Sequence, residues 1–305
     1  MKRTLSILLC VLIFAAAVSP SVCAITPIDT QRPSSLTLQY THGGKYFEGL
    51  NIRTYRIAEV FADGTYALTG DFASYPVKIY DVTSQSEWRN IATTLAAYAE
   101  ADDIEPTCTG VTDEWGMVSF TDILPGMYLT VSVTSVDGAT VTIFETFLTV
   151  VPHPSEDGDH DYDVTAIPKS DSYTTGGDIE YKVIKLWKDE GGTDKRPANV
   201  TVDILEDGEL KFTQVLSPEN NWSYSWKTAD DGSVWYIVER EVSEDYTVTV
   251  TREGNTFIIV NKIIQEIPEA PQTGDTMALW PYAVAMCLSG GGLIILATWR
   301  KRAEE

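Results

Sequence analysis

The feature that most constrains this chain is a series of short segments in which apolar and polar residues alternate. Residues 36–40, 128–133 and 246–250 are examples, rich in valine, threonine and tyrosine and separated by glycine, aspartate and proline. Alternation with period two is typical of strands with one buried face, and closely spaced turns favour sandwiches. The sequence therefore predicts an all-β chain of two Ig-like or prealbumin-like β-sandwich domains.

One helix is predicted within the first sandwich. Ser84 and Glu87 have the spacing of a capping box, in which each side chain binds the main chain of the other residue. Apolar residues then recur at helical spacing, which predicts one buried helix face. These residues are Trp88, Ile91, Leu95 and Tyr98.

A polar stretch suggests where the two domains are joined. Residues 170–178 read Ser-Asp-Ser-Tyr-Thr-Thr-Gly-Gly-Asp, a composition typical of a linker. We therefore expect a first domain over residues 35–169 and a second over residues 179–262. Residues 263–276 form a short connection after the second domain.

Two apolar segments indicate that the chain is exported and held at a membrane. Residues 1–24 have the charged start, short apolar run and small-residue cleavage site of a signal peptide, with cleavage expected after Ala24. A lipoprotein signal at Cys23 is the alternative. Residues 277–299 carry no charge and are long enough to span a bilayer, and the basic tail 300–305 suits a cytoplasmic end. The body is therefore expected outside the cell.

The net charge of the chain argues against nucleic-acid binding, and its cysteine content argues against disulfides within the exported body. The formal net charge is −22, and removing both ends takes away more bases than acids. Nucleic acid is not expected as a partner, because phosphate binding needs clustered lysine and arginine. Only Cys108 remains in the exported body, so no internal disulfide can form, and without a partner base it is expected to be structural.

No ordinary enzyme is predicted. The sequence has no phosphate-binding loop and no zinc-ligand spacing, and we expect no cofactor and no metal. Four aspartates alternate within residues 156–163, and calcium takes such ligands. Because Tyr162 stands where an EF-type loop needs glycine, we favour a solvated acidic turn over a calcium site.

Several pieces of the second domain, in order, resemble the B-type repeat of Gram-positive collagen adhesins and pilins. The first is Val-Ile-Lys-Leu-Trp-Lys-Asp at residues 183–189. The others are residues 195–197, 200–202, 220–224, 236–239 and 260–262. The first domain shows a looser hallmark of the same superfamily in residues 112–120 and 124–129.

This resemblance implies an intramolecular isopeptide bond between Lys185 and Asn261, promoted by Glu239. The alternation of each strand independently places these three polar residues on apolar faces, where they need one another. Burial favours a neutral amine and a protonated acid, so Lys185 can attack the Asn261 carbonyl, which Glu239 polarises. A hydrogen-bonded cluster without a covalent bond is the alternative. The end strands of the first domain lack lysine and asparagine, so no bond is expected there.

Near the C-terminus, a five-residue motif precedes the predicted membrane span. Ala270, Pro271, Gln272, Thr273 and Gly274 resemble the sortase motif Leu-Pro-any-Thr-Gly, with alanine in place of leucine. By this resemblance a sortase cuts after Thr273 and passes its acyl group to an amine. An uncleaved single-span anchor is the alternative.

Lys169 is a candidate for that amine. Residues 163–170 are similar to the pilin motif that ends an N-terminal pilin domain, although Ile167 and Ser170 replace its tyrosine and asparagine. In that family the lysine of the motif joins subunits. The alternative is an exposed lysine that leads into a linker.

Together these features predict a structural protein on the cell wall of a Gram-positive bacterium, a pilin or pilin-like subunit. The expected partners are a sortase and either a peptidoglycan precursor or other pilin subunits. A monomeric wall-anchored adhesin that binds a host or matrix ligand is the alternative.

Overall fold

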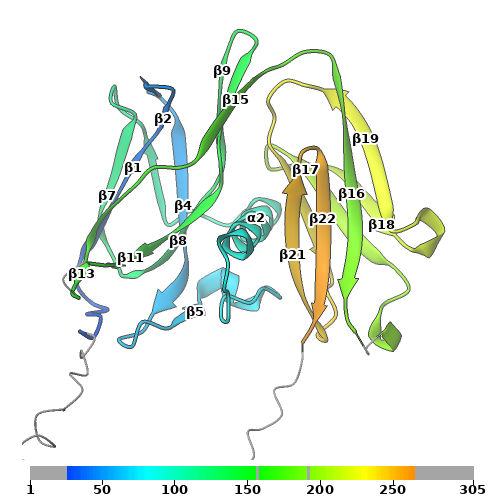
Figure 1. Ribbon diagram of the computed structural model, residues 1–305, viewed down its shortest axis with the longest axis horizontal. Helices are drawn as coiled ribbons and strands as arrows, with labels where there is room; N and C mark the ends of the chain where they lie inside the picture. Colours follow the sequence, from blue (N-terminus) through cyan, green and yellow to red (C-terminus); the bar gives the residue numbers. More distant parts are fainter. Residues whose placement is uncertain (1–25, 156–157, 191–192, 265–305) are drawn as a thin grey trace, which may run out of the picture. The chain divides into compact units, whose positions relative to one another are not determined.

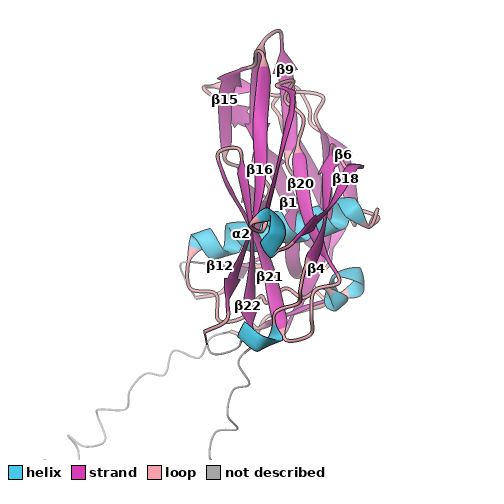
Figure 2. Ribbon diagram, turned by 90° about the vertical axis from the view of Figure 1, so that its right-hand side faces the viewer, coloured by secondary structure: helices cyan, strands magenta, loops and turns pink. Residues whose placement is uncertain are grey.

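The computed structural model describes residues 26–155, 158–190 and 193–264. These residues belong to one compact unit that is mostly β-structure (Figure 1). Figure 2 shows the strands in magenta, with α2 as the one α-helix of the described residues. Within the described ranges, no helix has the length and apolar character needed to cross a membrane. The predicted signal peptide and membrane span lie outside them.

The N-terminal part comprises the elements from residue 34 to residue 174. Its elements are β1 (Ser34–Gln39), β2 (Thr41–His42), β3 (Lys45–Tyr46), β4 (Asn51–Val60), β5 (Tyr66–Leu68), the 3-10 helix η1 (Gly70–Ser74), α2 (Gln85–Ala101), β6 (Cys108–Val111), β7 (Met117–Ile123), β8 (Gly126–Thr130), β9 (Val133–Asp137), β10 (Thr140–Phe144), β11 (Phe147–Val151), β12 (His153–Pro154), β13 (His160–Asp161), β14 (Asp163–Ala166) and β15 (Ser170–Thr174).

Three main sheets build this part. One has the order β14-β1-β7, a second runs β11-β8-β4-β5 with β6 also paired to β4, and a third has the order β15-β10-β9. Strand β1 lies parallel to β14, with Leu36 opposite Val164 and Leu38 opposite Ala166. Leu36 and Leu38 are fully buried. Apolar side chains therefore hold the inward positions of this parallel pair.

Helix α2 begins where the sequence predicted. The Ser84 side chain accepts a hydrogen bond from the Glu87 main-chain N–H, and Glu87 accepts one from the Ser84 N–H in return. The predicted capping box is thus confirmed. Ile91, Leu95 and Tyr98 are buried, as the helical spacing indicated.

The predicted linker over residues 170–178 was wrong for most of its length. Residues Ser170–Thr174 form β15, which pairs antiparallel with β10. Serine, threonine and tyrosine are compatible with a strand at the solvated edge of a sheet. The polar composition of these residues therefore does not by itself indicate a loop. The Thr142 and Ser172 hydroxyls share a hydrogen bond of 2.7 Å across the pair. Only residues 175–177 separate β15 from the next strand.

The C-terminal part comprises the elements from residue 178 to residue 263. Its elements are β16 (Asp178–Lys188), η2 (Thr193–Lys195), β17 (Val200–Glu206), β18 (Glu209–Leu216), η3 (Pro218–Asn220), β19 (Ser223–Ala229), β20 (Trp235–Arg240), β21 (Tyr246–Glu253) and β22 (Thr256–Ile263). They form one sheet with the order β19-β16-β22-β21 and another with the order β18-β17-β20. The first and last strands, β16 and β22, are parallel neighbours.

Strict alternation along these strands builds the interior between the two sheets. Tyr181, Val183 and Lys185 of β16 are buried, whereas the residues between them are exposed or half-buried. Phe257, Ile259 and Asn261 of β22 alternate in the same way. Because side chains of a strand point alternately to its two faces, one apolar face per strand is enough to set this register.

Candidate functional site

Three buried polar side chains meet between the sheets of the C-terminal part. Lys185 on β16 and Asn261 on β22 belong to one sheet, and Glu239 on β20 belongs to the other. The Lys185 Nζ lies 3.4 Å from the Glu239 Oε2. The Asn261 Nδ2 donates a 2.7 Å hydrogen bond to the Glu239 Oε1. One carboxyl group therefore contacts both the amine and the amide that the sequence analysis paired.

Burial drives both titratable groups toward their neutral forms. The exposed fraction is 2% for Lys185, 2% for Glu239 and 1% for Asn261. Desolvation lowers the pKa of Lys185 from 10.5 to about 8, although the Glu239 carboxylate opposes this shift. Desolvation also raises the pKa of Glu239 above its ordinary value, against the effects of Lys185 and the Asn261 hydrogen bond. The site thus favours a nucleophilic amine and a carboxylic acid.

Aromatic and charged side chains pack around the triad. The Lys185 Nζ lies 4.0 Å from the centroid of the Trp187 ring, and that ring packs edge-on against Tyr246. The Tyr246 hydroxyl donates to the Asp189 Oδ2, and Asp189 also accepts two hydrogen bonds from Arg196. The Trp187 ring over the amine contributes to the burial that lowers the pKa of Lys185.

The Asn261 amide can serve as an acyl donor in this arrangement. Its Oδ1 is buried and accepts no hydrogen bond from the described residues. Rotation about the last side-chain torsion exchanges the amide oxygen and nitrogen, which brings Oδ1 to the Glu239 carboxyl group. A protonated Glu239 can then donate to this oxygen and polarise the carbonyl. The geometry therefore provides a nucleophile, an electrophile and an acid within one buried cluster.

Lys169 lies apart from this triad. It is exposed in the three-residue connection between β14 and β15. Its main-chain oxygen accepts a 2.8 Å hydrogen bond from the Glu145 N–H, which fixes the backbone next to β10. Ile167, in the same connection, is 58% exposed. The Lys169 amine is thus accessible on a backbone that is held in place.

The other predicted features fall partly outside the described residues. Residues 270–274 and 277–299 lie there, as do residues 156–157 of the acidic turn. Among the described residues, no three histidine, cysteine or acidic side chains are grouped so that they could hold a metal. Cys108, on β6, is half-buried, and burial raises the pKa of its thiol. A raised pKa disfavours the reactive thiolate.

The sequence did not predict the residues that hold the main chain around Glu239 in place through hydrogen bonds. Tyr98 was predicted only as part of an apolar helix face, but its hydroxyl donates a 3.1 Å hydrogen bond to the main-chain oxygen of Glu239. Arg240, next to Glu239, binds Asp102 beyond the end of α2 and Asp203 on β17. Tyr98 and Glu239 are 141 residues apart, so no local pattern could have paired them.

In the C-terminal part of this β-protein, the first strand, β16, and the last strand, β22, are neighbours in one sheet. The interior of this part holds a lysine, an acid and an asparagine. Residues 181–262 match the family model of the Cna protein B-type domain. The chain therefore carries a Cna B-type domain, and all three triad residues lie within it.

A curated relative is the "Collagen adhesin" of Staphylococcus aureus. It is 26% identical over 203 residues, which are 64% of this chain. The chain spans only 13% of the length of that relative.

Several solved structures also align. A single B repeat unit of the collagen-binding surface protein of Staphylococcus aureus shares 15% identity over 77% of this chain and 99% of its own, with a TM-score of 0.27. The major pilin SpaD of Corynebacterium diphtheriae shares 16% identity over 78% of this chain and 66% of its own, with a TM-score of 0.31. The shaft pilin SpaA of Lactobacillus rhamnosus GG shares 14% identity over 77% of this chain and 100% of its own, with a TM-score of 0.29.

Proposed function

We propose that this protein is a structural, sortase-anchored subunit of a Gram-positive cell wall, a pilin or pilin-like protein stabilised by an isopeptide bond between Lys185 and Asn261. The observation that carries the proposal is the buried contact of both residues with Glu239 inside a Cna B-type domain. Burying a lysine and a glutamate costs desolvation energy even when the two groups pair, so such a triad needs a compensating role. A covalent bond removes the buried amine altogether.

The chemistry balances within the three side chains. The neutral Lys185 Nζ attacks the Asn261 Cγ, and a C–N bond forms while the bond from Cγ to Nδ2 breaks. The amine loses one proton and the departing nitrogen gains one, so ammonia leaves. The protonated Glu239 carboxyl group gives its proton to the Asn261 amide and takes up the proton that the amine loses, so it ends in the protonated state in which it began.

Two Ig-like sandwich domains, over residues 35–169 and 179–262, form the exported body in this proposal. The predicted span at 277–299 holds the precursor at the membrane until a sortase cuts between Thr273 and Gly274. The resulting Thr273 acyl group passes either to a peptidoglycan precursor or to an amine of another subunit. The exposed Lys169 supports the second route, because an acceptor amine must be reachable by another protein.

Attachment can be tested directly in the native organism. A denaturing blot of wall and membrane fractions, probed with antibody against this chain, is expected to show a high-molecular-weight ladder in the wall fraction. Only covalent linkage survives denaturation, so a ladder means polymerisation. A single band released from the wall contradicts polymerisation of this chain and leaves a monomeric anchored protein or a basal subunit, which favours adhesion.

A monomeric wall-anchored adhesin is the second candidate function, and the similarity to a collagen adhesin favours it. In that case binding of a host or matrix ligand is expected to depend on surface residues of the N-terminal part. Substitutions there would abolish binding without changing wall attachment. Unchanged binding after such substitutions speaks against this candidate.

The pH dependence of stability separates a free amine from an amide at Lys185. We expect the free energy of unfolding of an Asn261→Ala variant to rise, relative to the wild type, between pH 8 and 10.5. Burial lowers the pKa of a free Lys185 amine in the folded chain to about 8, against 10.5 in the unfolded chain, so the unfolded state of a chain without the bond binds more protons in that window. The rise should be on the order of 2 kcal/mol.

Unfolding curves of both proteins at several pH values measure this difference. Tyrosines and other lysines titrate in both proteins, so their contributions cancel in the comparison. A crosslinked Lys185 carries no titratable amine. If the free energies of unfolding of the two proteins change in parallel with pH, the wild type therefore keeps its free lysine.

A further inference from the structure

Two strand edges of the C-terminal part are covered by the N-terminal part. Strand β20 ends the sheet β18-β17-β20, and β21 ends the sheet β19-β16-β22-β21. Exposed edges carry unpaired main-chain groups, and proteins often cover them with a helix. Here helix α2 packs against both edge strands. The strand that carries Glu239 is thus held by β17 on one side and by a helix on the other.

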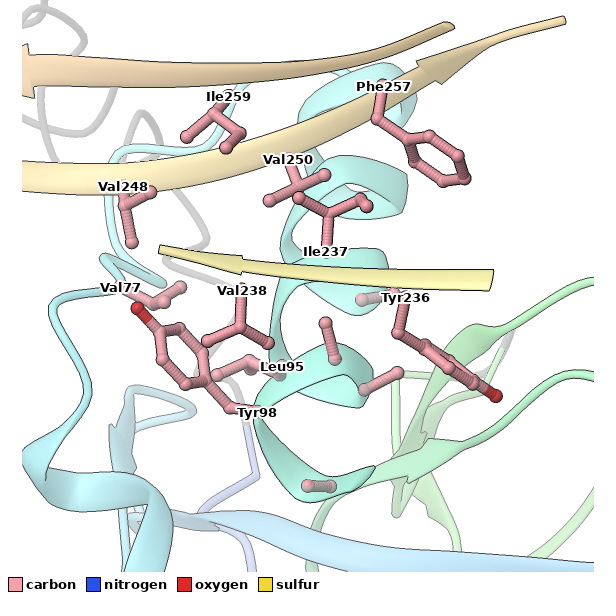
Figure 3. Packing of buried hydrophobic residues seen from close by; sticks show 14 of the residues in the cluster. Val77, Leu95, Tyr98, Tyr236, Ile237, Val238, Val248, Val250, Phe257 and Ile259 are labelled. Carbon is pink, nitrogen blue, oxygen red and sulfur yellow. The ribbon is translucent and has the colours of Figure 1, made fainter. Parts of the chain in front are cut away.

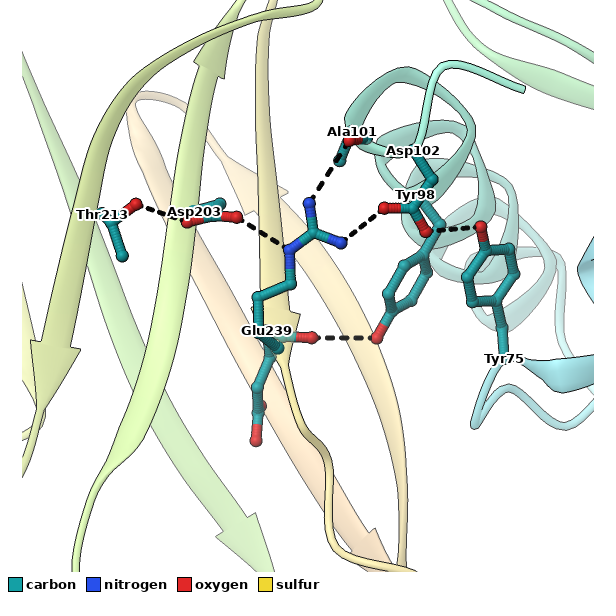
Figure 4. A network of polar contacts seen from close by, with 8 residues as sticks. Tyr75, Tyr98, Ala101, Asp102, Asp203, Thr213 and Glu239 are labelled. Atoms are coloured by element: carbon teal, nitrogen blue, oxygen red, sulfur yellow. Dashed lines mark hydrogen bonds and ion pairs between the residues drawn. The ribbon is translucent and has the colours of Figure 1, made fainter. Parts of the chain in front are cut away.

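The N-terminal part makes hydrogen bonds to main-chain groups of both edge strands, β20 and β21. The Tyr98 hydroxyl donates to the main-chain oxygen of Glu239 at 3.1 Å, and this contact is buried (Figure 4). The Val250 N–H of β21 donates to the Thr94 Oγ1 at 2.8 Å. The Val248 N–H donates to the main-chain oxygen of Pro76 at 2.8 Å. Residues preceding and within α2 therefore replace the missing neighbouring strand.

Arg240 adds a charged link at the end of β20. Its Nη1 donates to the Asp102 Oδ1 at 2.6 Å, and its Nη2 donates to the main-chain oxygen of Ala101. Its Nε donates to the Asp203 Oδ2 at 2.7 Å on the neighbouring strand β17 (Figure 4). Because Arg240 directly follows Glu239, these contacts fix the backbone on the C-terminal side of the acid.

Apolar packing completes the contact. Tyr98 and Leu95 of α2 lie beside Val238 of β20, and Val77 lies beside Val248 of β21 (Figure 3). Residues Trp235–Val238 are all buried, so both faces of β20 are covered. One face of the strand meets the sandwich interior and the other meets the helix.

We propose that helix α2 positions Glu239 for the crosslink, with Tyr98 as the positioning residue, so that the Lys185–Asn261 bond forms efficiently only after the helix has docked. This inference rests on the proposed isopeptide bond. Tyr98 does not touch the reacting atoms; it acts through the main chain of Glu239. Crosslinking then reports that the two parts of the chain have folded against each other.

The physical reason is the precision that the reaction demands. The carboxyl group must reach both Nζ and the amide at hydrogen-bond distance, and small misplacements of a catalytic group are costly in rate. An edge strand without its outer hydrogen bonds can shift relative to the facing sheet. Losing one buried hydrogen bond changes an equilibrium by about ten-fold, so we expect Tyr98→Phe to slow the reaction by about that factor.

The test follows ammonia loss over time in the full chain. Protein is isolated unfolded from inclusion bodies and refolded by dilution. Before refolding, an intact mass equal to the full sequence mass confirms that the crosslink has not yet formed. Tryptophan fluorescence reports folding, and intact mass reports crosslinking. Tyr98→Phe is compared with Tyr128→Phe. The second substitution also removes the hydroxyl of a buried tyrosine that donates to a main-chain oxygen, but its hydrogen bond, to Leu124, is part-buried and lies within the N-terminal part.

We expect Tyr98→Phe to fold yet lose ammonia about ten-fold more slowly than wild type, while Tyr128→Phe reacts at the wild-type rate. Thr94→Ala should slow the reaction as well, and Thr94→Ser, which keeps the hydroxyl, should restore it. These Thr94 variants also decide the question if Tyr98→Phe fails to fold. Equal rates for the Tyr98 and Tyr128 variants, or for the Thr94 pair, overturn the positioning role. A wild-type chain that never loses ammonia instead overturns the proposed bond itself.

Discussion

Folded wild-type protein is expected to be lighter than its sequence mass by one ammonia, and Glu239→Ala is expected to restore the full mass. The Glu239 carboxyl group contacts both Lys185 and Asn261, and it is the acid among the three triad residues. Without it, the carbonyl is not polarised and the departing nitrogen receives no proton. Intact-mass measurement of the folded exported body distinguishes the two states directly.

The same substitution should lower the free energy of unfolding by on the order of 4 kcal/mol, by analogy with a disulfide that closes a long loop. Glu206→Ala is the matched control, because it also removes a glutamate that pairs with a lysine, Lys211, in the neighbouring strand. That variant should still lose ammonia. A wild type at its full sequence mass would rule out the isopeptide bond.

Lys169→Ala is expected to abolish polymers while leaving the fold and the isopeptide bond intact. In the proposed assembly its amine accepts the Thr273 acyl group of the next subunit, and an alanine offers no nucleophile. The side chain is exposed, so its removal should cost little stability. The measurement is the high-molecular-weight ladder on a denaturing blot, with intact mass as the check on crosslinking.

Lys227→Ala serves as the control for this experiment. Lys227 is likewise exposed, on β19, and its loss should leave the ladder unchanged. If polymers persist in Lys169→Ala, another amine joins the subunits and Lys169 has no part in assembly. If both variants lose the ladder, the effect is not specific to Lys169.

The inward direction of Lys185, Glu239 and Asn261 could be predicted from the sequence because a strand repeats every two residues. Each of these polar residues stands in phase with buried apolar neighbours, such as Val183 and Ile259, and the structure confirms that all are buried. Periodicity shows that a side chain points inward but not which strand lies opposite. The pairing came from resemblance to a known repeat.

The surroundings of the triad were harder to predict, for two physical reasons. The apolar face of α2 shows that the helix is buried, but the same face would suit many partners, and contacts such as Thr94 with Val250 join residues 156 positions apart. Strand β15 was mistaken for a linker because its side chains are polar. Its hydrogen bonds to β10 depend on tertiary position rather than on local composition.

The parallel pairing of β16 with β22 determines how a pulling force would pass through the C-terminal part. Force enters at Asp178 and leaves at Ile263, which lie at opposite ends of the paired strands. Such strands are loaded in shear, so their ladder hydrogen bonds must yield together rather than one at a time. The proposed bond from Lys185 to Asn261 would carry this force between the two strands by a covalent path. In the proposed assembly, the chain between these two residues would then lie outside the line of force and would remain folded while the subunits are pulled apart.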